Sequence, residues 1–402
     1  MKKILVAVLV LLMGNGLWCD LQDHYKKGTI VLKGVAGFGE GIDWEDLFYD
    51  PYKDMVVALD GSVFVSNSRT HNVFKFDKQG KLVKKLGSRG VGPGDFNFPL
   101  DLSIMDGKYL VVEESGSNRR FSIWDLEGKF TKVVKTNTSI FYLTALRDNR
   151  VAYFFFKQHA EKKNGYQSIV YIIIKDINTG KEKVLQKITL LNRSRIILDR
   201  GMSTGLGNFF GQVYLAQTIN GNLAVGISNQ PKIKIYSPDG DMIHSFDLKI
   251  KPIAVDNKYL EEFRDNVMTH LKKEGERYKY MNRTEKFWHE LYKKTFPKFD
   301  YSTIFEKCLP LYKEILVDSE GNFLVFKYTQ CQENCNPIFQ VYSKKGEFIC
   351  ETVLDRGKYE LNIDRRFKRI CFTSEGIFGL FIEKGDEDEI LRLIKSNYNP
   401  AP

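Results

Sequence analysis

Nine charged or amide side chains in the first 230 residues could bind a ligand, because they lie beside short apolar segments. A guanidinium group presents a planar fork of N–H donors that matches carboxylate, phosphate and sulfate groups. The 60 Lys and Arg residues outnumber the 50 Asp and Glu residues, and the net charge of +10 favours an anionic partner. The candidate residues are Asn67, Arg69, His71, Glu113, Glu114, Arg119, Arg120, Asn229 and Gln230.

These side chains are positioned by a segment that recurs along the chain, in which a short strand of β-branched and aromatic residues precedes a polar triplet and a glycine. Upstream of each copy lies a second turn of the kind that joins the strands of a hairpin. The four clearest copies are 73–81, 121–129, 233–241 and 339–347, and the upstream turns begin at Asp60, Asp106, Asp148, Asn220, Glu320 and Glu375.

Each unit holds two turns and four strands in about 45 to 60 residues, which fits one four-stranded blade of a β-propeller. A content of 43% hydrophobic and 27% charged residues excludes a disordered chain. Six upstream turns predict an all-β, six-bladed propeller with antiparallel blades, as one domain over 20–402. The last unit offers three strands, so we expect residues 29–32 to add its outermost strand, close the ring and cover an exposed edge.

The segment 65–81, followed by the glycine-rich linker 86–99, resembles an NHL repeat. The chain as a whole is similar to the exported six-bladed β-propeller proteins of bacteria, a group with NHL-like and TolB-like members. The resemblance implies the fold and a tendency to bind partners. Activity does not follow from it, because NHL-like families include RNA and protein binders as well as lyases and lactonases.

The resemblance makes a calcium-dependent lactonase or lyase at the mouth of the central channel the alternative to a binding module. Asn67, Glu113 and Asn229 could supply oxygen ligands for calcium from three different blades. The six histidines are too scattered for the several-histidine site of a zinc lyase. We therefore expect a non-catalytic binding module without a cofactor, and calcium remains the alternative.

Four long insertions interrupt the repeat, and blade topology places them on one face of the disc. They follow second strands or connect successive blades, whereas the short Asp-Gly turns lie on the opposite face. Functional residues concentrate on loops held by a rigid scaffold, so we expect the ligand at the loop-rich face. The insertions are 159–167, 192–209, 256–305 and 328–336.

The insertion 256–305 is predicted to be helical, because apolar residues recur at helical spacing after Asp256, a suitable N-cap. A second helix is expected to begin at Thr284. The basic polar sides could indicate a helix on a membrane surface. Packing on the propeller is the favoured interpretation, and it would form a partial lid over Arg69, Arg119 and Arg120.

Residues 1–19 have the pattern of an export signal, in which Lys2 and Lys3 precede an apolar run from Ile4 to Met13. The run is about half of the roughly 20 residues that cross a bilayer as a helix. We expect a periplasmic, cell-surface or extracellular protein. Its only membrane contact would be a lipid anchor at Cys19, which stays open as an alternative to free secretion.

Export would expose the cysteines to an oxidising compartment. Cys331 and Cys335 are the expected disulfide, and an odd number of cysteines after residue 19 leaves at least one of Cys308, Cys350 and Cys371 as a thiol. An exported partner is expected: a protein, a peptide or an anionic glycan of the cell envelope. Nucleic acid fits the basic charge but not the export signal.

Overall fold

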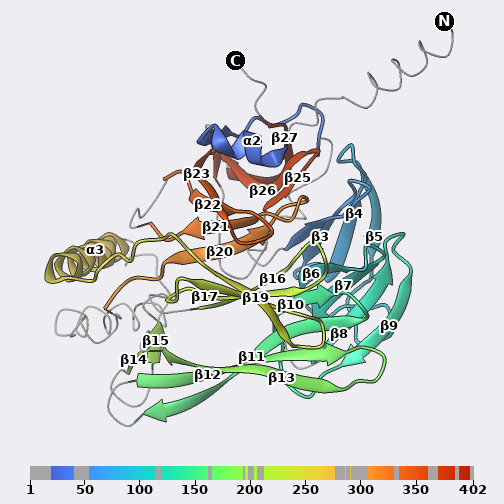
Figure 1. The fold of residues 1–402 in the computed structure, drawn as a ribbon, viewed down its shortest axis with the longest axis horizontal. Helices are drawn as coiled ribbons and strands as arrows, with labels where there is room; N and C mark the ends of the chain where they lie inside the picture. Colours follow the sequence, from blue (N-terminus) through green and yellow to red (C-terminus); the bar gives the residue numbers. More distant parts are fainter. Residues whose placement is uncertain are drawn as a thin grey trace, which may run out of the picture.

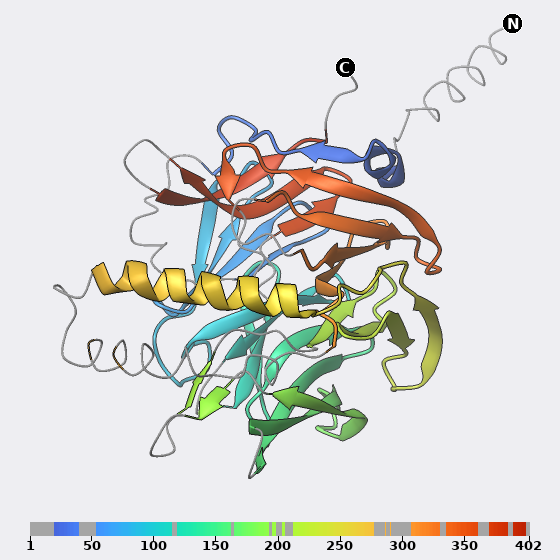
Figure 2. The same ribbon diagram turned by 90° about the vertical axis from the view of Figure 1, so that its left-hand side faces the viewer.

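The structure is a computed structural model in which six sheets are arranged as blades around one axis (Figure 1 and Figure 2). The predicted all-β, six-bladed propeller is confirmed. The expected export signal, 1–19, lies outside the described residues. The described residues are 20–39, 54–114, 119–161, 165–192, 195–197, 203–205, 212–276, 286, 290, 307–329, 335–360, 370–384 and 389–398.

The first three blades follow the order of the chain, with each strand antiparallel to the next. Blade one contains β2 (Met55–Val57), β3 (Val63–Asn67), β4 (Asn72–Phe76) and β5 (Leu82–Leu86). Blade two contains β6 (Pro99–Met105), β7 (Tyr109–Glu114), β8 (Arg120–Asp125) and β9 (Phe130–Lys135). Blade three contains β10 (Phe141–Leu146), β11 (Arg150–Glu161), β12 (Gly165–Asp176) and β13 (Glu182–Asn192).

The remaining blades repeat this order. Blade four contains β16 (Val213–Gln217), β17 (Leu223–Ile227), β18 (Lys232–Tyr236) and β19 (Met242–Asp247). Blade five contains β20 (Tyr312–Val317), β21 (Phe323–Lys327), β22 (Ile338–Tyr342) and β23 (Phe348–Asp355). Blade six contains β25 (Ile370–Thr373), β26 (Gly376–Lys384), β27 (Glu389–Ser396) and the short β24 (Tyr359–Glu360), which also pairs with β26. A separate pair, β14 (Arg195–Ile197) and β15 (Ser203–Gly205), lies between blades three and four.

The recurring glycines permit the tight turns between strands. Gly61 and Gly80 have φ angles of 82° and 80°, in the left-handed region that strains other residues. The Asp77 carboxylate accepts hydrogen bonds from the N–H groups of Gln79 and Lys81, at 3.0 and 2.9 Å. The polar triplet and glycine of the sequence are therefore a hydrogen-bonded hairpin turn.

Neighbouring blades are held together by apolar side chains buried between facing sheets. Phe64 of blade one packs with Leu102 and Trp124 of blade two. The ring closes in the same way, because Phe74 of blade one packs with Phe378 of blade six. Full burial of one such side chain contributes about 1.5–3 kcal/mol, so these contacts between blades supply much of the stability.

Ring closure by residues 29–32 in blade six is a wrong prediction. The strand β1 (Thr29–Val31) pairs in parallel with β23 of blade five, and Thr29 lies opposite Val353. The chain reaches blade six only after β1, where Gly34 forms an isolated antiparallel bridge to Ser396. Blade five therefore gains a fifth strand, and blades six and one close the ring through side-chain packing.

The helix α2 (Leu21–Lys26) explains this pairing, because it anchors the chain to blade five just before β1. Tyr25 is fully buried, and its hydroxyl donates a 3.0 Å hydrogen bond to Asp318. The carbonyl of Tyr25 accepts a hydrogen bond from the Thr352 hydroxyl at 2.8 Å. Two buried contacts thus leave β1 beside β23 rather than β27.

The insertion expected at 159–167 is a continuation of two strands. His159 pairs with Gln167 in antiparallel register, and β11 and β12 are 12 residues long each. The β-branched and aromatic residues of this region favour strands, which the sequence interpretation overlooked. Blade three therefore extends beyond its neighbours as a long hairpin.

The expected Cys331–Cys335 bridge stays a prediction, because Cys331 lies outside the described residues. Cys308 and Cys350 are half-buried free thiols. The expectation of at least one free thiol among Cys308, Cys350 and Cys371 is confirmed. Burial raises the pKa of the Cys350 thiol, as is usual for a thiol that packs as an apolar group.

Replacing Tyr25 with Phe should lower the free energy of unfolding by about 1–3 kcal/mol, because the buried Asp318 carboxyl loses a hydrogen-bond donor. Urea unfolding followed by circular dichroism measures the loss. Lys26→Ala is the control, since Lys26 pairs with Asp23 only on the exposed surface. Equal stability of the Phe variant and the parent would contradict the anchoring role of this contact.

A second test concerns pH. Burial and the neighbouring Asp20 raise the pKa of Glu320 to about 7, from an ordinary 4.5. Between these values the folded protein retains a proton that the unfolded chain has released, so stability should fall as pH rises from about 5 to about 8. Glu320→Gln should remove this component of the fall, measured as the free energy of unfolding at both pH values. Glu347→Gln, in the next turn of blade five, should keep it.

Candidate functional site

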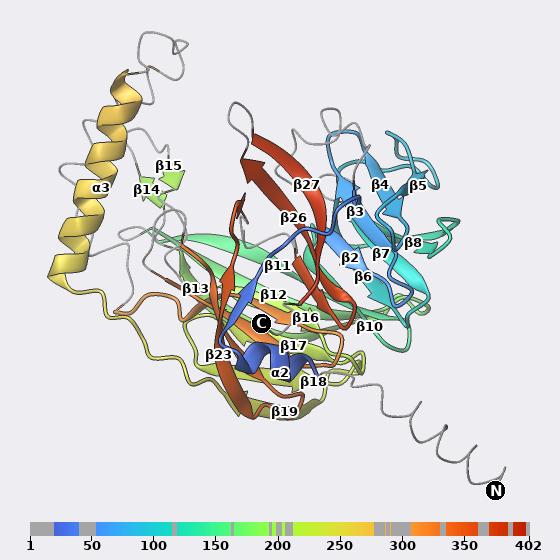
Figure 3. The ribbon, with the colours of Figure 1, turned by 90° about the horizontal axis from the view of Figure 1, so that it is seen from above.

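The loop-rich face is the side of the disc that carries the β3–β4, β7–β8, β17–β18 and β21–β22 connections and the linkers between blades. The helix α3 (Asn257–Glu276) lies across this face in Figure 2. Seen from above in Figure 3, the helix stands away from the strands of the six blades. The loop-rich face therefore carries the helical insertion, as the sequence predicts.

The start of α3 supplies its described contact with the propeller. The Asp256 carboxylate accepts a hydrogen bond from the Tyr259 N–H at 2.8 Å, which confirms the predicted N-cap. Burial and a hydrogen bond with Tyr328 raise the pKa of Tyr259.

The lid over Arg69, Arg119 and Arg120 stays a prediction. Of the expected second helix, only Lys286 and Glu290 are described, and both are helical.

Asn67 shapes the β3–β4 turn of blade one. Its side-chain oxygen accepts hydrogen bonds from the N–H groups of Arg69 and Thr70, at 3.1 and 3.2 Å. Asn67 is buried, whereas the Arg69 side chain is exposed. An Asn turn of this kind fixes the loop that presents Arg69 to solvent.

His71 holds an exposed aromatic ring in place. Its Nδ1 accepts a hydrogen bond from the Phe98 N–H at 3.3 Å, and the two rings meet edge to face with centroids 5.2 Å apart. Phe98 is 51% exposed. The backbone is left-handed at both residues, with φ of 60° at Phe98 and 56° at His71. Left-handed backbone costs a residue with a Cβ about 1–2 kcal/mol, and such strain is typical of functional sites. Sequence reasoning missed Phe98.

Arg120 and Glu114 form a buried ion pair that braces blade two against the linker from blade one. The Arg120 guanidinium donates to the Glu114 carboxylate at 2.9 Å and to the carbonyls of Val91 and Asp95 at 2.6 and 3.0 Å. The same carboxylate accepts the Asn97 N–H at 2.9 Å. The Arg120 guanidinium therefore connects blade two to the linker from blade one.

The other candidates divide by exposure. Glu113 is fully buried on β7. Arg119, with φ of 43°, is exposed beside Arg120, and it donates to the Asn137 carbonyl at 3.4 Å. The structure thus brings His71, Glu114, Arg119 and Arg120 together where blades one and two meet.

Asn229 and Gln230 lie apart from this group, in the β17–β18 turn of blade four, where both are exposed. The Gln230 N–H donates to the Ile227 carbonyl at 2.7 Å. Within the described part of the chain, no group of three or more His, Cys, Asp and Glu side chains is placed to hold a metal ion. No described helix is long and apolar enough to cross a membrane.

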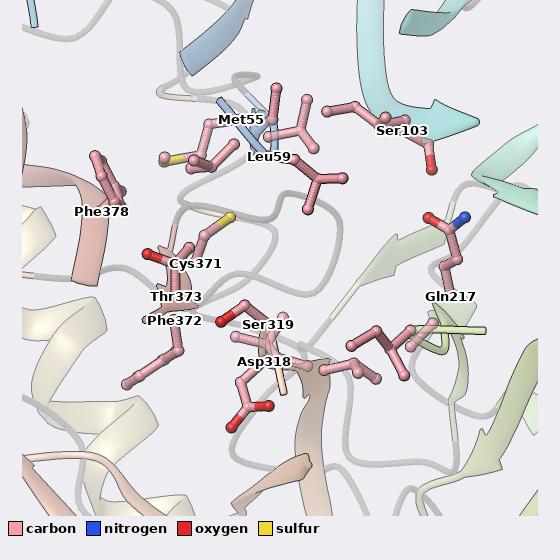
Figure 4. A pocket seen from close by; sticks show the side chains of 18 of the residues that line it. Met55, Leu59, Ser103, Gln217, Asp318, Ser319, Cys371, Phe372, Thr373 and Phe378 are labelled. Atoms are coloured by element: carbon pink, nitrogen blue, oxygen red, sulfur yellow. The ribbon is translucent and has the colours of Figure 1, made fainter. Parts of the chain in front are cut away.

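A cavity of about 360 Å³ occupies the central channel, lined by inner strands of five blades. Figure 4 shows Met55, Leu59 and Phe378 around it, with the polar groups of Ser103 and Gln217 at one side. The lining also includes Gly61 and other turn residues, so the cavity lies toward the face opposite the loop-rich face. Sequence patterns did not predict it.

The comparisons with known proteins identify a family. A sequence profile described as "6-bladed beta-propeller" matches residues 52–309. That match does not extend to NHL repeats specifically, so the NHL resemblance stays a prediction. No curated protein matches the chain.

Three solved structures are similar over most of their length. A DUF4221 family member from Bacteroides vulgatus is 14% identical with a TM-score of 0.47, over 91% of this chain and 98% of that one. A protein of Bacteroides fragilis, provisionally named as exported, is 10% identical with a TM-score of 0.44, over 90% and 99%. Virginiamycin B lyase from Staphylococcus aureus is 10% identical with a TM-score of 0.38, over 87% and 97%. At TM-scores below 0.5, these likenesses carry no argument about function.

The ion pair at blade two gives a test of bracing. Glu114→Gln should lower the free energy of unfolding by about 3–5 kcal/mol, because it leaves the buried Arg120 charge without its counter-charge. Thermal and urea unfolding measure this loss. Asp247→Asn is the control, since the side chains of Asp247 and its partner Lys232 are 75% and 44% exposed, and it should change stability by less than about 1 kcal/mol. Similar small losses in both variants would argue against bracing.

Proposed function

This chain belongs to the six-bladed β-propeller family, and we propose from that premise that it is a binding module whose ligand contacts the loop-rich face. The observation that carries the proposal is the junction of blades one and two. There a buried ion pair and strained turns hold Arg69, Phe98 and Arg119 exposed. Recognition surfaces commonly combine such exposed arginine and aromatic groups on a rigid support.

The positive charge of the protein favours an anionic ligand. Arg69 and Arg119 offer guanidinium forks to carboxylate, phosphate or sulfate groups, and the whole chain carries a net charge of +10. A protein, a peptide or an acidic glycan of the cell envelope would meet this requirement. The export pattern of residues 1–19 supports such a partner over nucleic acid.

The double variant Arg69→Ala/Arg119→Ala should bind polygalacturonate and poly-glutamate at least about tenfold more weakly than the parent, because each charge-assisted hydrogen bond contributes about 1.5–3 kcal/mol. Isothermal titration calorimetry at fixed ionic strength measures the change. Lys81→Ala/Lys129→Ala, which removes two cations from turns of the opposite face, is the control and should bind as the parent does.

Failure of the parent to bind either polymer would sink the proposal. A calcium-dependent enzyme is the alternative use of the same face, so each titration is repeated after calcium is removed with a chelator. Binding that needs stoichiometric calcium would favour the enzyme, and binding that is indifferent to the chelator would favour the module.

A further inference from the structure

Two cations at the loop-rich end of blade five have no ion pair with any described residue. Arg356 follows β23, and Lys313 is the second residue of β20. Arg356 is 9% exposed and Lys313 is half-buried. A buried charge is costly unless a group of opposite charge or a set of hydrogen bonds compensates it.

Neither cation has such compensation within the described part of the chain. The Arg356 Nε is buried without a hydrogen-bond partner there. For Lys313, burial and the positive charge of Arg356 both lower the pKa of the ammonium group. Both residues lie at the same end of blade five, because β20 begins there and β23 ends there.

Two carboxylates of blade five accept hydrogen bonds from other groups. Asp355 accepts hydrogen bonds from the Gly357 N–H and the Asn336 amide, at 3.1 and 3.3 Å. Glu351 accepts from Lys327 at 3.0 Å. These two acidic groups are therefore engaged by other donors.

We propose that Lys313 and Arg356 form a binding site for an oxyanion, namely a phosphate, sulfate or carboxylate group, at the loop-rich end of blade five. An oxyanion would bridge the ammonium and the guanidinium and give the buried Nε an acceptor. Lys313 keeps part of its surface in solvent, so a small ion can reach the site.

This site goes beyond the proposed function. It depends on buried cations of blade five, whereas the proposed ligand contacts exposed groups of blades one and two. Tyr328, at the end of β21, meets the first turn of α3, so the insertion begins close to the same end of the blade. The oxyanion could be a free ion or a group on a larger ligand, and both share the same chemistry.

The test titrates the purified protein with inorganic phosphate, sulfate and acetate by calorimetry, with chloride keeping the ionic strength constant. The parent should bind at least one of these anions saturably with one site per chain. Lys313→Met and Arg356→Met should each weaken that binding at least tenfold. Arg356→Lys, which keeps the charge but not the fork, should bind more tightly than Arg356→Met. Preference for phosphate and sulfate would indicate a tetrahedral group, and preference for acetate would indicate a carboxylate.

Thermal unfolding adds a readout that a purely structural role would not produce. Without added oxyanion, Lys313→Met should unfold at a higher temperature than the parent, because it removes one of two repelling cations. Phosphate, or whichever anion binds, should raise the unfolding temperature of the parent but not of this variant. Lys344→Met, an exposed position on the opposite face of the same blade, is the control and should respond like the parent.

Absence of saturable binding for all three anions would overturn the site, and so would unchanged binding in both Met variants. The Arg69→Ala/Arg119→Ala variant should keep its response to the small anions. Loss of polymer binding with intact small-anion binding therefore concerns only the exposed surface of blades one and two, and the reverse concerns only Lys313 and Arg356.

Discussion

Every blade of this protein depends on its neighbours to cover apolar surface on both faces of its sheet. All five residues of β3 are buried, and Phe74 on β4 can be buried only because blade six packs against blade one. A single blade would expose one or both apolar faces, so the sheets are stable only as a closed ring. The polar groups at the loop-rich end share this dependence. Arg120 and Glu114 are shielded from solvent because two blades and their linker meet there. The low exposure of this ion pair therefore depends on the packing of neighbouring blades.

The blades could be predicted from the sequence because their signal is local. The Asp77 turn makes its hydrogen bonds within four residues, so its polar triplet and glycine recur wherever a blade turns back. The place of β1 has no such signal. It is decided by Tyr25 and Asp318, residues 293 apart in the sequence, and by a hydrogen bond to Thr352. An open sheet edge in blade six suggested the wrong partner, because edge pairing was weighed without the buried tyrosine that fixes the preceding helix.

The candidate site shows the same limit at the scale of single side chains. Arg119 and Arg120 are adjacent and chemically equal in the sequence, yet one is exposed and the other pairs with Glu114. Successive residues of a strand point to opposite sides, so their roles depend on where β8 begins, which the sequence leaves open by a residue or two. Phe98 was missed because an exposed aromatic residue in a linker has no periodic pattern. Lys313 lies on the inner strand of blade five and Arg356 follows the outer strand β23, and only the folded sheet places both at its loop-rich end.

The position of α2 determines on which side of the disc the chain enters the propeller. The Leu21 N–H donates to Glu320 in the turn between β20 and β21, at 3.1 and 3.2 Å from its two oxygens. The chain therefore enters the propeller on the side away from the loop-rich face. A lipid or another polypeptide attached before this helix would therefore be linked to the face opposite the loop-rich face. The loop-rich face would then point away from the attachment point, and a ligand could bind there without reorientation of the propeller.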